Sequence, residues 1–406
     1  MSKSDNLNSN SRIQIVDALR GSALLGILLL HSVEHWESQR YPEHSSALLS
    51  LLDVKTYNLA TFLFTNKAYS IFAMMFGLSF FLIMESWSKR DTKFQGRFLW
   101  RLCILGIFGY LEGIIYCGDV LLVLAILGIP LVLLFRLSNR TLIWIAIVLL
   151  LQLPMLWQVI HIFHDQAYQP GIPNQWKYFG HLNEVYSKGT FWEVTKINLW
   201  KGQLSRLLWT VETGRYLQME GLFICGLLIG RSHIFRDPIR YLKLGKSLLI
   251  IGTISFVILY PVKIYLGYWD LKDMRYFYTD SLFFTYCSIA QMAIWTGGFI
   301  LLYQWNKTNG ILNLLAPYGR MSLTLYVTQA LVGVPLFYGY GLALYHYMGP
   351  FYSIFYGAAF FIVQSLFAHY WLKNFNYGPL EWLWRSFAFF SFKTPLRKRK
   401  LISIEN

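Results

Sequence analysis

Two ionisable side chains stand eleven residues apart in an apolar segment near the start of the chain. Arg20 and His31 are separated mainly by apolar residues, and eleven residues are about three turns of an α-helix. Both side chains then lie on one face, roughly 16 Å apart along the axis. An arginine holds phosphate through paired donors, and a histidine can act as a general base. The spacing favours chemistry on a long anionic substrate. The structural alternative is that Arg20 pairs with Asp17 and His31 closes the helix.

His31 also begins the pentapeptide His31-Ser32-Val33-Glu34-His35, which fits the inverted zinc-protease pattern H-x-x-E-H. Two histidines four residues apart on a helix can share a metal ion. However, no second, suitably placed acidic ligand stands out, and polar residues are common where a helix leaves a membrane. We therefore expect no metal at this position.

Further ionisable residues interrupt other apolar segments, where a charge is costly and usually marks a functional cavity. Arg101 and Glu112 are again eleven residues apart and lie on one face of a helix. Asp119 follows where that segment ends. We predict that the catalytic set comprises His31, Arg20, Asp119 and Glu112. Taken singly, a residue of this kind is more often structural.

The composition indicates which elements must hold these residues. Of the 406 residues, 55% are hydrophobic and 14% are charged, against about 25% charged in an average globular domain. A soluble protein of this size needs more charge to cover its surface, so we infer an integral membrane protein. Disulfide scaffolds, disordered chains and nucleic-acid-binding modules are excluded. The four cysteines lie in or beside apolar segments without CxxC spacing, which favours buried hydrophobic roles.

A transmembrane helix needs roughly 20 apolar residues. The expected fold is all-α, a polytopic transmembrane helix bundle of about ten spans. An uncleaved first span is favoured because no small-residue cleavage site follows it. Segment 56–66 is expected to lie against the membrane before the second span. The predicted spans are 13–33, 68–87, 98–116, 119–135, 142–164, 216–231, 247–267, 281–304, 321–341 and 351–372.

The distribution of charge orients these spans. With the N-terminus in the cytoplasm, ten spans return the C-terminus there, and that side holds 24 of the 36 basic residues but 7 of the 21 acidic ones. An excess of Lys and Arg in cytoplasmic loops is the usual pattern. We therefore predict both termini in the cytoplasm. The outer side then holds connections 34–55 and 165–215, the second an ordered cap, and the basic tail 391–406 is a cytoplasmic orientation signal or an anionic-lipid contact.

Several stretches resemble the YeiB-type family of bacterial membrane proteins, in the family's order and over nearly the whole chain. The C-terminal half, residues 216–390, resembles this family in particular. The matching stretches are Val16–Leu30 (VDALRGSALLGILLL), Ile71–Phe80 (IFAMMFGLSF), Tyr116–Leu127 (YCGDVLLVLAIL), Gly319–Gln329 (GRMSLTLYVTQ), Phe337–Tyr345 (FYGYGLALY) and Gly378–Arg385 (GPLEWLWR).

The N-terminal half, residues 1–215, also resembles a wider superfamily of membrane acyltransferases. That superfamily includes the heparan-glucosaminide acetyltransferase and the bacterial polysaccharide O-acyltransferases. The latter carry an arginine and a histidine eleven residues apart on their first span, which Arg20 and His31 match. YeiB-type sequences often carry another residue at the position of His31, which leaves the role of the pair open.

The resemblance implies an acyltransferase of the bacterial inner membrane. An acyl group such as acetyl would pass from acyl-CoA on the cytoplasmic side to an acceptor near the outer face, with His31 as general base. The acceptor class (glycan, lipid or small metabolite) is left open, and neither nucleic acid nor a metal is expected as a partner. Contacts with the CoA donor are expected from Arg20, Lys67, Arg97 and Arg101.

Two other functions fit the same residues. A transporter of a small anionic or polar solute would use Glu112, Asp119, Glu220 and His31 as a substrate or proton path. No internal repeat is clear enough to propose inverted halves, which weakens that interpretation. A non-catalytic membrane subunit would instead present the 165–215 connection to a partner protein.

Overall fold

A computed structural model describes residues 14–43, 45–89, 94–269, 271–305, 310 and 312–398. Within these residues the chain is helical, and the one β-type pairing is an isolated bridge between Phe375 and Arg397. Both chain termini lie outside the described residues. So do the first residue of the first predicted span and residues 399–406 of the predicted basic tail.

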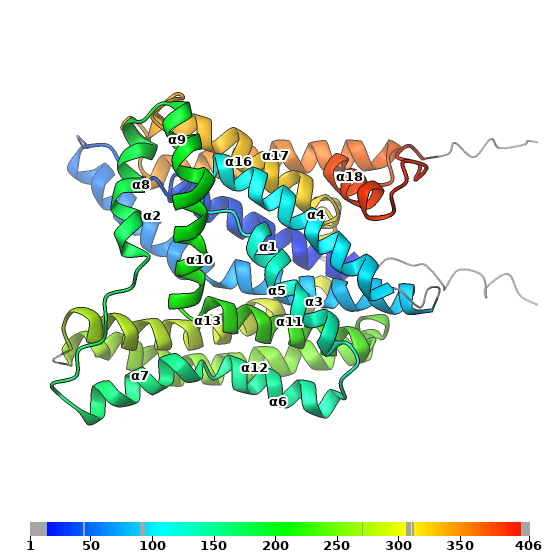
Figure 1. The fold of residues 1–406 in the computed structure, drawn as a ribbon, viewed down its shortest axis with the longest axis horizontal. Helices are drawn as coiled ribbons and strands as arrows, with labels where there is room; N and C mark the ends of the chain where they lie inside the picture. Colours follow the sequence, from blue (N-terminus) through cyan, green and yellow to red (C-terminus); the bar gives the residue numbers. More distant parts are fainter. Residues whose placement is uncertain are drawn as a thin grey trace, which may run out of the picture.

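The described helices run mostly along the long axis of the molecule (Figure 1). In chain order they are α1 (Gln14–Val33), α2 (Ala47–Phe64), α3 (Lys67–Ser88), α4 (Phe94–Ile115), α5 (Leu121–Leu134), α6 (Asn139–Leu150), α7 (Leu153–His164), α8 (Trp176–Lys188), α9 (Phe191–Ile197), α10 (Gln203–Glu212), α11 (Arg215–Arg231), α12 (Pro238–Tyr265), α13 (Asp273–Gln304), α15 (Leu315–Arg320), α16 (Ser322–Phe337), α17 (Pro350–Asn374) and α18 (Pro379–Ala388).

All ten predicted spans fall on helices, with one internal break. Span 142–164 is divided between α6 and α7, whose axes differ by 41°. The break lies at Gln152, where φ is 54°, and Pro154 follows in the first turn of α7. A proline is well placed there because the first N–H groups of a helix have no intrahelical partner. The segment 56–66 is the end of α2 and the turn into α3, and α2 packs on α1 and α17.

The chain is a multi-pass membrane protein. Among the described residues, six helical stretches are long and apolar enough to cross a membrane, and the bent α6–α7 pair raises this to seven. α5 and α16 are apolar but shorter than a full crossing. Apolar side chains stay exposed along α12 and α17, where lipid replaces water as the surrounding solvent. The count of ten spans and the cytoplasmic side of the termini stay predictions.

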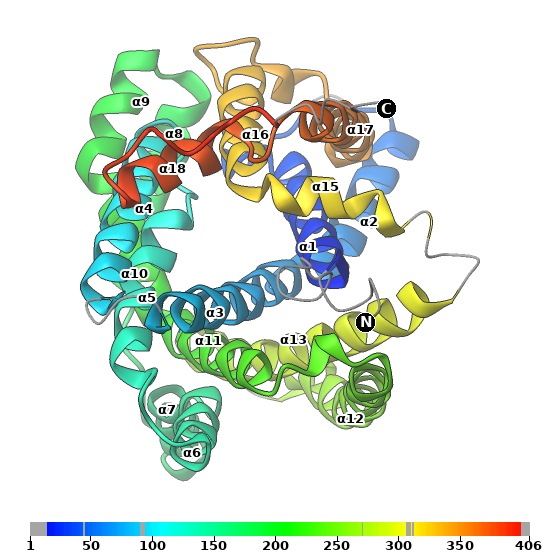
Figure 2. The same ribbon diagram turned by 90° about the vertical axis from the view of Figure 1, so that its right-hand side faces the viewer.

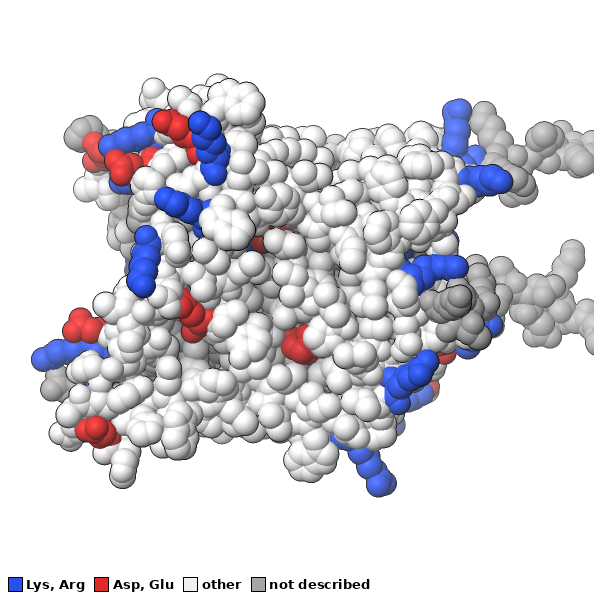
Figure 3. Space-filling model, in the orientation of Figure 1, with Lys and Arg blue, Asp and Glu red and all other residues white. Residues whose placement is uncertain are grey.

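Viewed along the bundle, α1, α3, α4, α5, α15 and α16 form a ring; α11 and α13 lie side by side against α3, and α6, α7 and α12 lie farther out (Figure 2). The predicted outer cap at 165–215 folds into α8, α9 and α10 at the end away from the start of α1 (Figure 1). Basic side chains predominate at the end where α1 begins and α18 lies, whereas both signs of charge occur at the other end (Figure 3). This is the asymmetry on which the predicted orientation rests, and the orientation itself stays a prediction.

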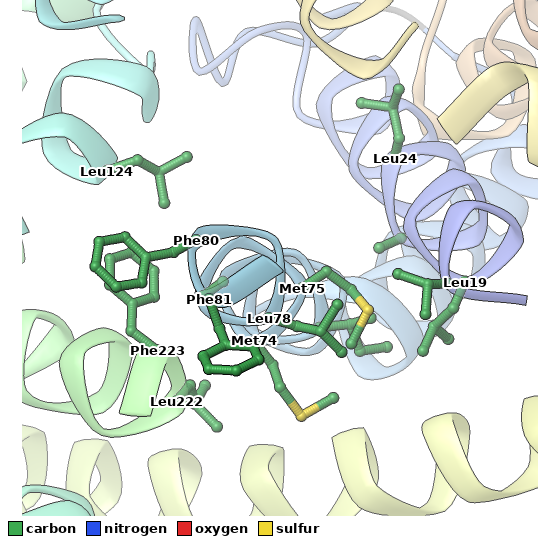
Figure 4. Packing of buried hydrophobic residues seen from close by; sticks show 14 of the residues in the cluster. Leu19, Leu24, Met74, Met75, Leu78, Phe80, Phe81, Leu124, Leu222 and Phe223 are labelled. Atoms are coloured by element: carbon green, nitrogen blue, oxygen red, sulfur yellow. The ribbon is translucent and has the colours of Figure 1, made fainter. Parts of the chain in front are cut away.

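The hydrophobic core centres on α3, which packs against both α1 and α11. Met75 and Leu78 of α3 are directed toward Leu19 of α1, while Leu222 and Phe223 of α11 approach α3 from the other side (Figure 4). α3 therefore joins the ring to α11.

Glycines bring the backbones of neighbouring helices into direct contact. A Cβ atom on Gly319 of α15 would lie 1.9 Å from the Asp17 carbonyl oxygen of α1, and one on Gly21 would lie 2.3 Å from the Leu315 carbonyl oxygen. Small residues at helix interfaces are the usual means of close packing in membranes, where no hydrophobic effect drives helices together. The α1–α15 contact holds the helix that carries Arg20 and His31.

We expect Gly319→Ala to lower the melting temperature of the detergent-purified protein, because the added methyl group meets backbone that cannot move aside. Overpacking of this kind typically costs about 1–3 kcal/mol. Gly298→Ala is the matched control, since nothing lies within 4 Å of a Cβ atom built there. Equal melting temperatures for the two variants would contradict the close contact.

Candidate functional site

A cavity of about 1380 Å³ lies at the basic end of the bundle. Most of its lining comes from α1, α3, α4, α5, α16 and α18, and α12 and α13 add Tyr241 and Tyr303. Three acidic residues, Asp17, Glu85 and Glu381, belong to its wall. The basic residues of the wall outnumber them, and they are Arg20, Lys89, Arg101, Arg236, Arg320 and Arg385. We call this space the inner cavity; its net positive charge suits an anionic ligand.

Arg20 is held in position at the wall of the inner cavity. Its guanidinium donates to Asp17 Oδ1 at 3.1 Å, to Ser79 Oγ at 2.6 Å and to the Gly319 carbonyl oxygen at 3.5 Å. The predicted ion pair with Asp17 is therefore present, and the side chain also lines the cavity. The structural and ligand-binding roles that the sequence left as alternatives are both compatible with this geometry.

Arg101 joins the same wall from α4. Its guanidinium stacks 3.8 Å from the ring centre of Trp384, and the Trp384 indole N–H donates to the Arg101 carbonyl oxygen at 2.9 Å. Arg385, the next residue of α18, lies over Tyr377 at 5.2 Å. These contacts orient the cations through aromatic faces, and among the residues that the structure describes no carboxylate pairs with Arg101 or Arg385.

Glu381 also lines the inner cavity, but its carboxylate is hydrogen-bonded within the protein. It accepts hydrogen bonds from the N–H groups of Leu323 and Thr324 at 2.8 and 3.0 Å, and from the Thr324 hydroxyl at 2.6 Å. This arrangement caps the first turn of α16, where a negative charge complements the helix dipole. Glu381 thus ties α18 to α16 and holds one side of the cavity in place.

His31 belongs to a second polar region, at the other end of α1. Its Nδ1 is 2.9 Å from the Tyr116 hydroxyl, and the two rings meet edge to face at 5.4 Å. His31 is half-buried, and so are its acidic neighbours Glu34 and Glu37. We call the group of His31, Glu34, Glu37, Tyr116 and Arg206 the outer polar cluster.

Arg206 of α10 supplies the positive charge of the outer polar cluster. Its Nη1 lies 3.3 Å from Glu37 Oε1, and its Nη2 donates to the Gly118 carbonyl oxygen at 2.7 Å. Burial lowers the pKa of Arg206, but the charge of Glu37 and the neighbouring Tyr116 raise it more, so the pKa lies above its usual range. Arg206 is therefore a permanent cation close to His31.

Asp119 links the two polar regions. Its carboxylate accepts from the N–H groups of Leu121 and Leu122 at 3.0 and 3.2 Å and so caps α5. Leu121 lines the inner cavity, while Asp119 interacts electrostatically with Arg206 of the outer polar cluster. Glu112 lies beside Asp119 and is buried. The predicted catalytic carboxyl groups thus lie between the cavity and His31.

Two of the residues expected to contact a donor lie elsewhere. Lys67 is buried at the start of α3, with its ammonium 5.1 Å from the ring centre of Phe284. Arg97 is exposed on α4 and stacks over Phe389 at 5.7 Å. Neither residue lines the inner cavity. The structure therefore brings Arg20 and Arg101 together and places Lys67 and Arg97 apart from them.

The two histidines of the H-x-x-E-H pentapeptide, at the end of α1, contact different partners. His35 uses both ring nitrogens, with Nδ1 2.7 Å from the Arg40 carbonyl oxygen and Nε2 2.8 Å from Ser353 Oγ. His31 contacts Tyr116 instead. The described residues contain no cluster of three or more His, Cys, Asp or Glu side chains with metal-binding geometry.

Comparisons with known proteins find a family model and several bacterial relatives, all without an assigned function. A family model described as "Protein of unknown function (DUF418)" matches residues 229–391. The uncharacterized protein YxaH of Bacillus subtilis is 26% identical over 97% of this chain and 98% of its own length. An uncharacterized 39.9 kDa protein of Bacillus acidopullulyticus is 25% identical over 95% of this chain and 96% of its own. YeiB of Escherichia coli, also uncharacterized, is 24% identical over 91% and 94%. Over nearly its whole length the chain is thus similar to proteins of the YeiB type. No solved structure matches it significantly.

The most informative residues of the site that could not be found from the sequence are Arg206 and Tyr116. Arg206 stands in the 165–215 connection, which the sequence marks as an outer cap rather than as part of a site. The amphipathic character of α10 is the one local signal, because it predicts a buried face but not what that face meets. Tyr116 stands in a stretch that carries the family resemblance, yet only the tertiary structure places it against His31.

Glu34 makes the stability of the outer polar cluster depend on pH. Burial and the neighbouring Glu37 raise the pKa of Glu34 from 4.5 to about 8, against the opposing charge of Arg206. The folded state therefore retains a proton that the unfolded state loses. The resulting stabilisation is complete below about pH 4.5 and is lost as the pH rises to about 8.

We expect Glu34→Gln to flatten the fall in melting temperature between pH 5 and pH 8, because glutamine is neutral throughout, like the protonated acid. Thermal unfolding of the detergent-purified protein at both pH values measures this. Glu43→Gln, at an exposed position, is the control and should leave the pH dependence as in the parent. An unchanged slope in Glu34→Gln would show that another group is responsible.

Proposed function

We propose that the protein is an acyltransferase of the bacterial inner membrane, which moves an acyl group such as acetyl from acyl-CoA to an acceptor near the outer face. The observation that carries the proposal is the inner cavity: it collects arginines at the basic end and reaches Leu121, next to the outer polar cluster. The resemblance of the first span to membrane acyltransferases supports it.

The inner cavity suits the donor in size and charge. Its volume of about 1380 Å³ exceeds the roughly 300–1,000 Å³ of ordinary ligand pockets, as a long cofactor requires. Arg20 and Arg101 would hold the phosphate groups of CoA, and the aromatic side chains of Tyr377 and Trp384 offer faces for its adenine. The thioester end would then lie toward Leu121 and Asp119.

The outer polar cluster supplies the chemistry in this proposal. His31 accepts the proton of an acceptor hydroxyl, whose oxygen attacks the thioester carbonyl carbon. The carbon–sulfur bond breaks, and the departing CoA thiolate takes the proton from the imidazolium. Arg206 provides a fixed positive charge nearby for the oxyanion that forms in between.

Tyr116 decides whether His31 can act as a base. If the Nδ1–H donates to the Tyr116 oxygen, Nε2 carries a free lone pair and can accept a proton. If the tyrosine donates instead, Nε2 bears the hydrogen and is no base. The proposal requires the first arrangement, and Tyr116 is then a positioning residue.

We expect Arg20→Ala and Arg101→Ala each to weaken acetyl-CoA binding at least tenfold, because each removes a cation from the inner cavity. A tenfold loss corresponds to about 1.4 kcal/mol. Titration calorimetry on the detergent-purified protein measures this. Lys243→Ala is the control, since Lys243 is exposed at the same end and does not line the cavity. No binding of acyl-CoA at millimolar concentration would refute the donor site.

We expect His31→Ala to reduce release of free CoA from acetyl-CoA by roughly 10²–10⁴-fold, the usual contribution of a general base. Tyr116→Phe should reduce it about five- to tenfold and change its pH profile, since one hydrogen bond is lost. The assay follows thiol release in proteoliposomes. Retained turnover in folded, inserted His31→Ala would remove histidine from the mechanism.

Transport of a small anionic or polar solute is the second candidate. The buried Glu112–Asp119 pair between the two polar regions favours it, because two adjacent carboxyl groups at such a depth share protons readily. Transport predicts solute flux in proteoliposomes without covalent change and without dependence on acyl-CoA. Flux without release of free CoA, lost in Asp119→Asn, would favour this function over acyl transfer.

A further inference from the structure

Three basic side chains surround one aromatic ring in the half of the molecule away from the inner cavity. Lys67 of α3, Lys263 of α12 and Arg215 of α11 lie 5.1, 5.7 and 5.7 Å from the ring centre of Phe284. Their charged groups are therefore within about 11 Å of one another. Like charges repel, so an anion bound among these three groups would stabilise them.

The protein supplies little of the missing negative charge. Asp280 lies 2.9 Å from the ammonium of Lys263. Lys67 donates to the Thr61 carbonyl oxygen at 3.4 Å, a long contact with a neutral group. Within the described part of the chain, the Arg215 guanidinium contacts aromatic rings but no hydrogen-bond acceptor, although Arg215 is 8% exposed. A buried guanidinium with unused donors points to a ligand.

Two helix N-termini meet at the same place. Lys67 is the first residue of α3 and Arg215 the first of α11, and both helices begin after a left-handed residue, Asn66 and Gly214, without a side-chain cap. The N–H groups of a first helical turn attract anions. Asn66 is 4% exposed, and neither its side-chain oxygen nor its nitrogen has a hydrogen-bond partner in the described structure. This is a second set of unused polar atoms beside the three cations.

Trp209 connects this cluster to the outer polar cluster. Arg206 lies 4.6 Å from the centre of the indole ring and Arg215 lies 5.0 Å from it. An anion held by Arg215 is thus separated by one side chain from the arginine that flanks His31.

We infer that Lys67, Arg215 and Lys263, with the N-termini of α3 and α11, form a binding site for a phosphate group. A carboxylate carries one negative charge, whereas a phosphate ester can carry up to two and accepts hydrogen bonds from several donors at once. A phosphate therefore matches Lys67 and Arg215 better than a carboxylate does. The phosphate belongs either to the headgroup of a membrane lipid or to a soluble ester. If the proposed acyl transfer holds, on which this last step rests, the occupant would present its acceptor hydroxyl toward His31.

The test measures thermal stabilisation of the detergent-purified protein by three probes: inorganic phosphate, a short-chain phosphatidic acid and the matching phosphate-free diacylglycerol. We expect the first two to raise the melting temperature and the third to have no effect. Binding of phosphatidic acid at least tenfold tighter than that of inorganic phosphate would identify a lipid headgroup as the ligand. Equal affinities would identify a soluble phosphate ester as the class of ligand.

Arg215→Met should weaken phosphate binding at least tenfold, and Lys201→Met, at an exposed lysine of the outer cap, should not. Lys263→Met, at a part-exposed position, serves if the first variant fails to fold. Because the inner cavity is also basic, Arg20→Ala is measured in parallel. Binding that survives Arg20→Ala and is lost in Arg215→Met supports the site.

Two results would overturn the inference. One is the absence of stabilisation by either phosphate probe. The other is binding that depends on Arg20 and not on Arg215, which would assign it to the inner cavity. Neither result touches acyl-CoA binding at Arg20 and Arg101, so the failure of this site is distinguishable from failure of the proposed enzyme activity.

Discussion

A charge within a bilayer needs a partner or water, and this constraint accounts for where the polar residues lie. Moving an unpaired charge to the centre of a membrane costs about 2.5–3.5 kcal/mol on insertion scales. Arg20 meets the constraint with Asp17 and Ser79. Arg206, in the predicted outer cap, is likewise paired, with Glu37 and a backbone carbonyl. Arg101 uses an aromatic face instead. Because each arginine contacts a group from another part of the chain, these polar contacts hold the helices in register.

Glycine packing makes those contacts possible. α1 and α15 touch through Gly21 and Gly319, and α3 and α11 touch in the same way, since a Cβ atom on Gly77 or Gly226 would lie 2.0 Å from a carbonyl oxygen of the other helix. Backbones this close bring Arg20 within reach of the Gly319 carbonyl oxygen and set Lys67 and Arg215 side by side at the helix starts. Small residues at interfaces therefore determine which charges become neighbours.

The helices could be predicted from the sequence, and part of the site could not. Apolar length alone locates the spans, because a helix is the local solution for backbone in lipid. The distance between Arg20 and His31 can also be predicted from the sequence, since both residues lie on one helix. Arg97 and Lys67 are predicted to lie near Arg20, and they do not. Whether a charged side chain on a helix enters the cavity depends on which other helices pack against that helix, and the sequence does not show this. Arg206 shows the same limit, because it reaches His31 from a connection far away in the chain.

The apolar part of α1 between Arg20 and His31 gives the molecule two polar regions rather than one open channel. Leu24 and Leu28 are fully buried there, so a charged solute has no continuous polar wall along this helix. Reactions that move a small neutral group past such a barrier, while the charged carrier stays on its own side, need less desolvation than passage of the whole carrier. An acetyl group attached to CoA is of this kind. The distribution of charge along α1 therefore favours group transfer over transport of an ion.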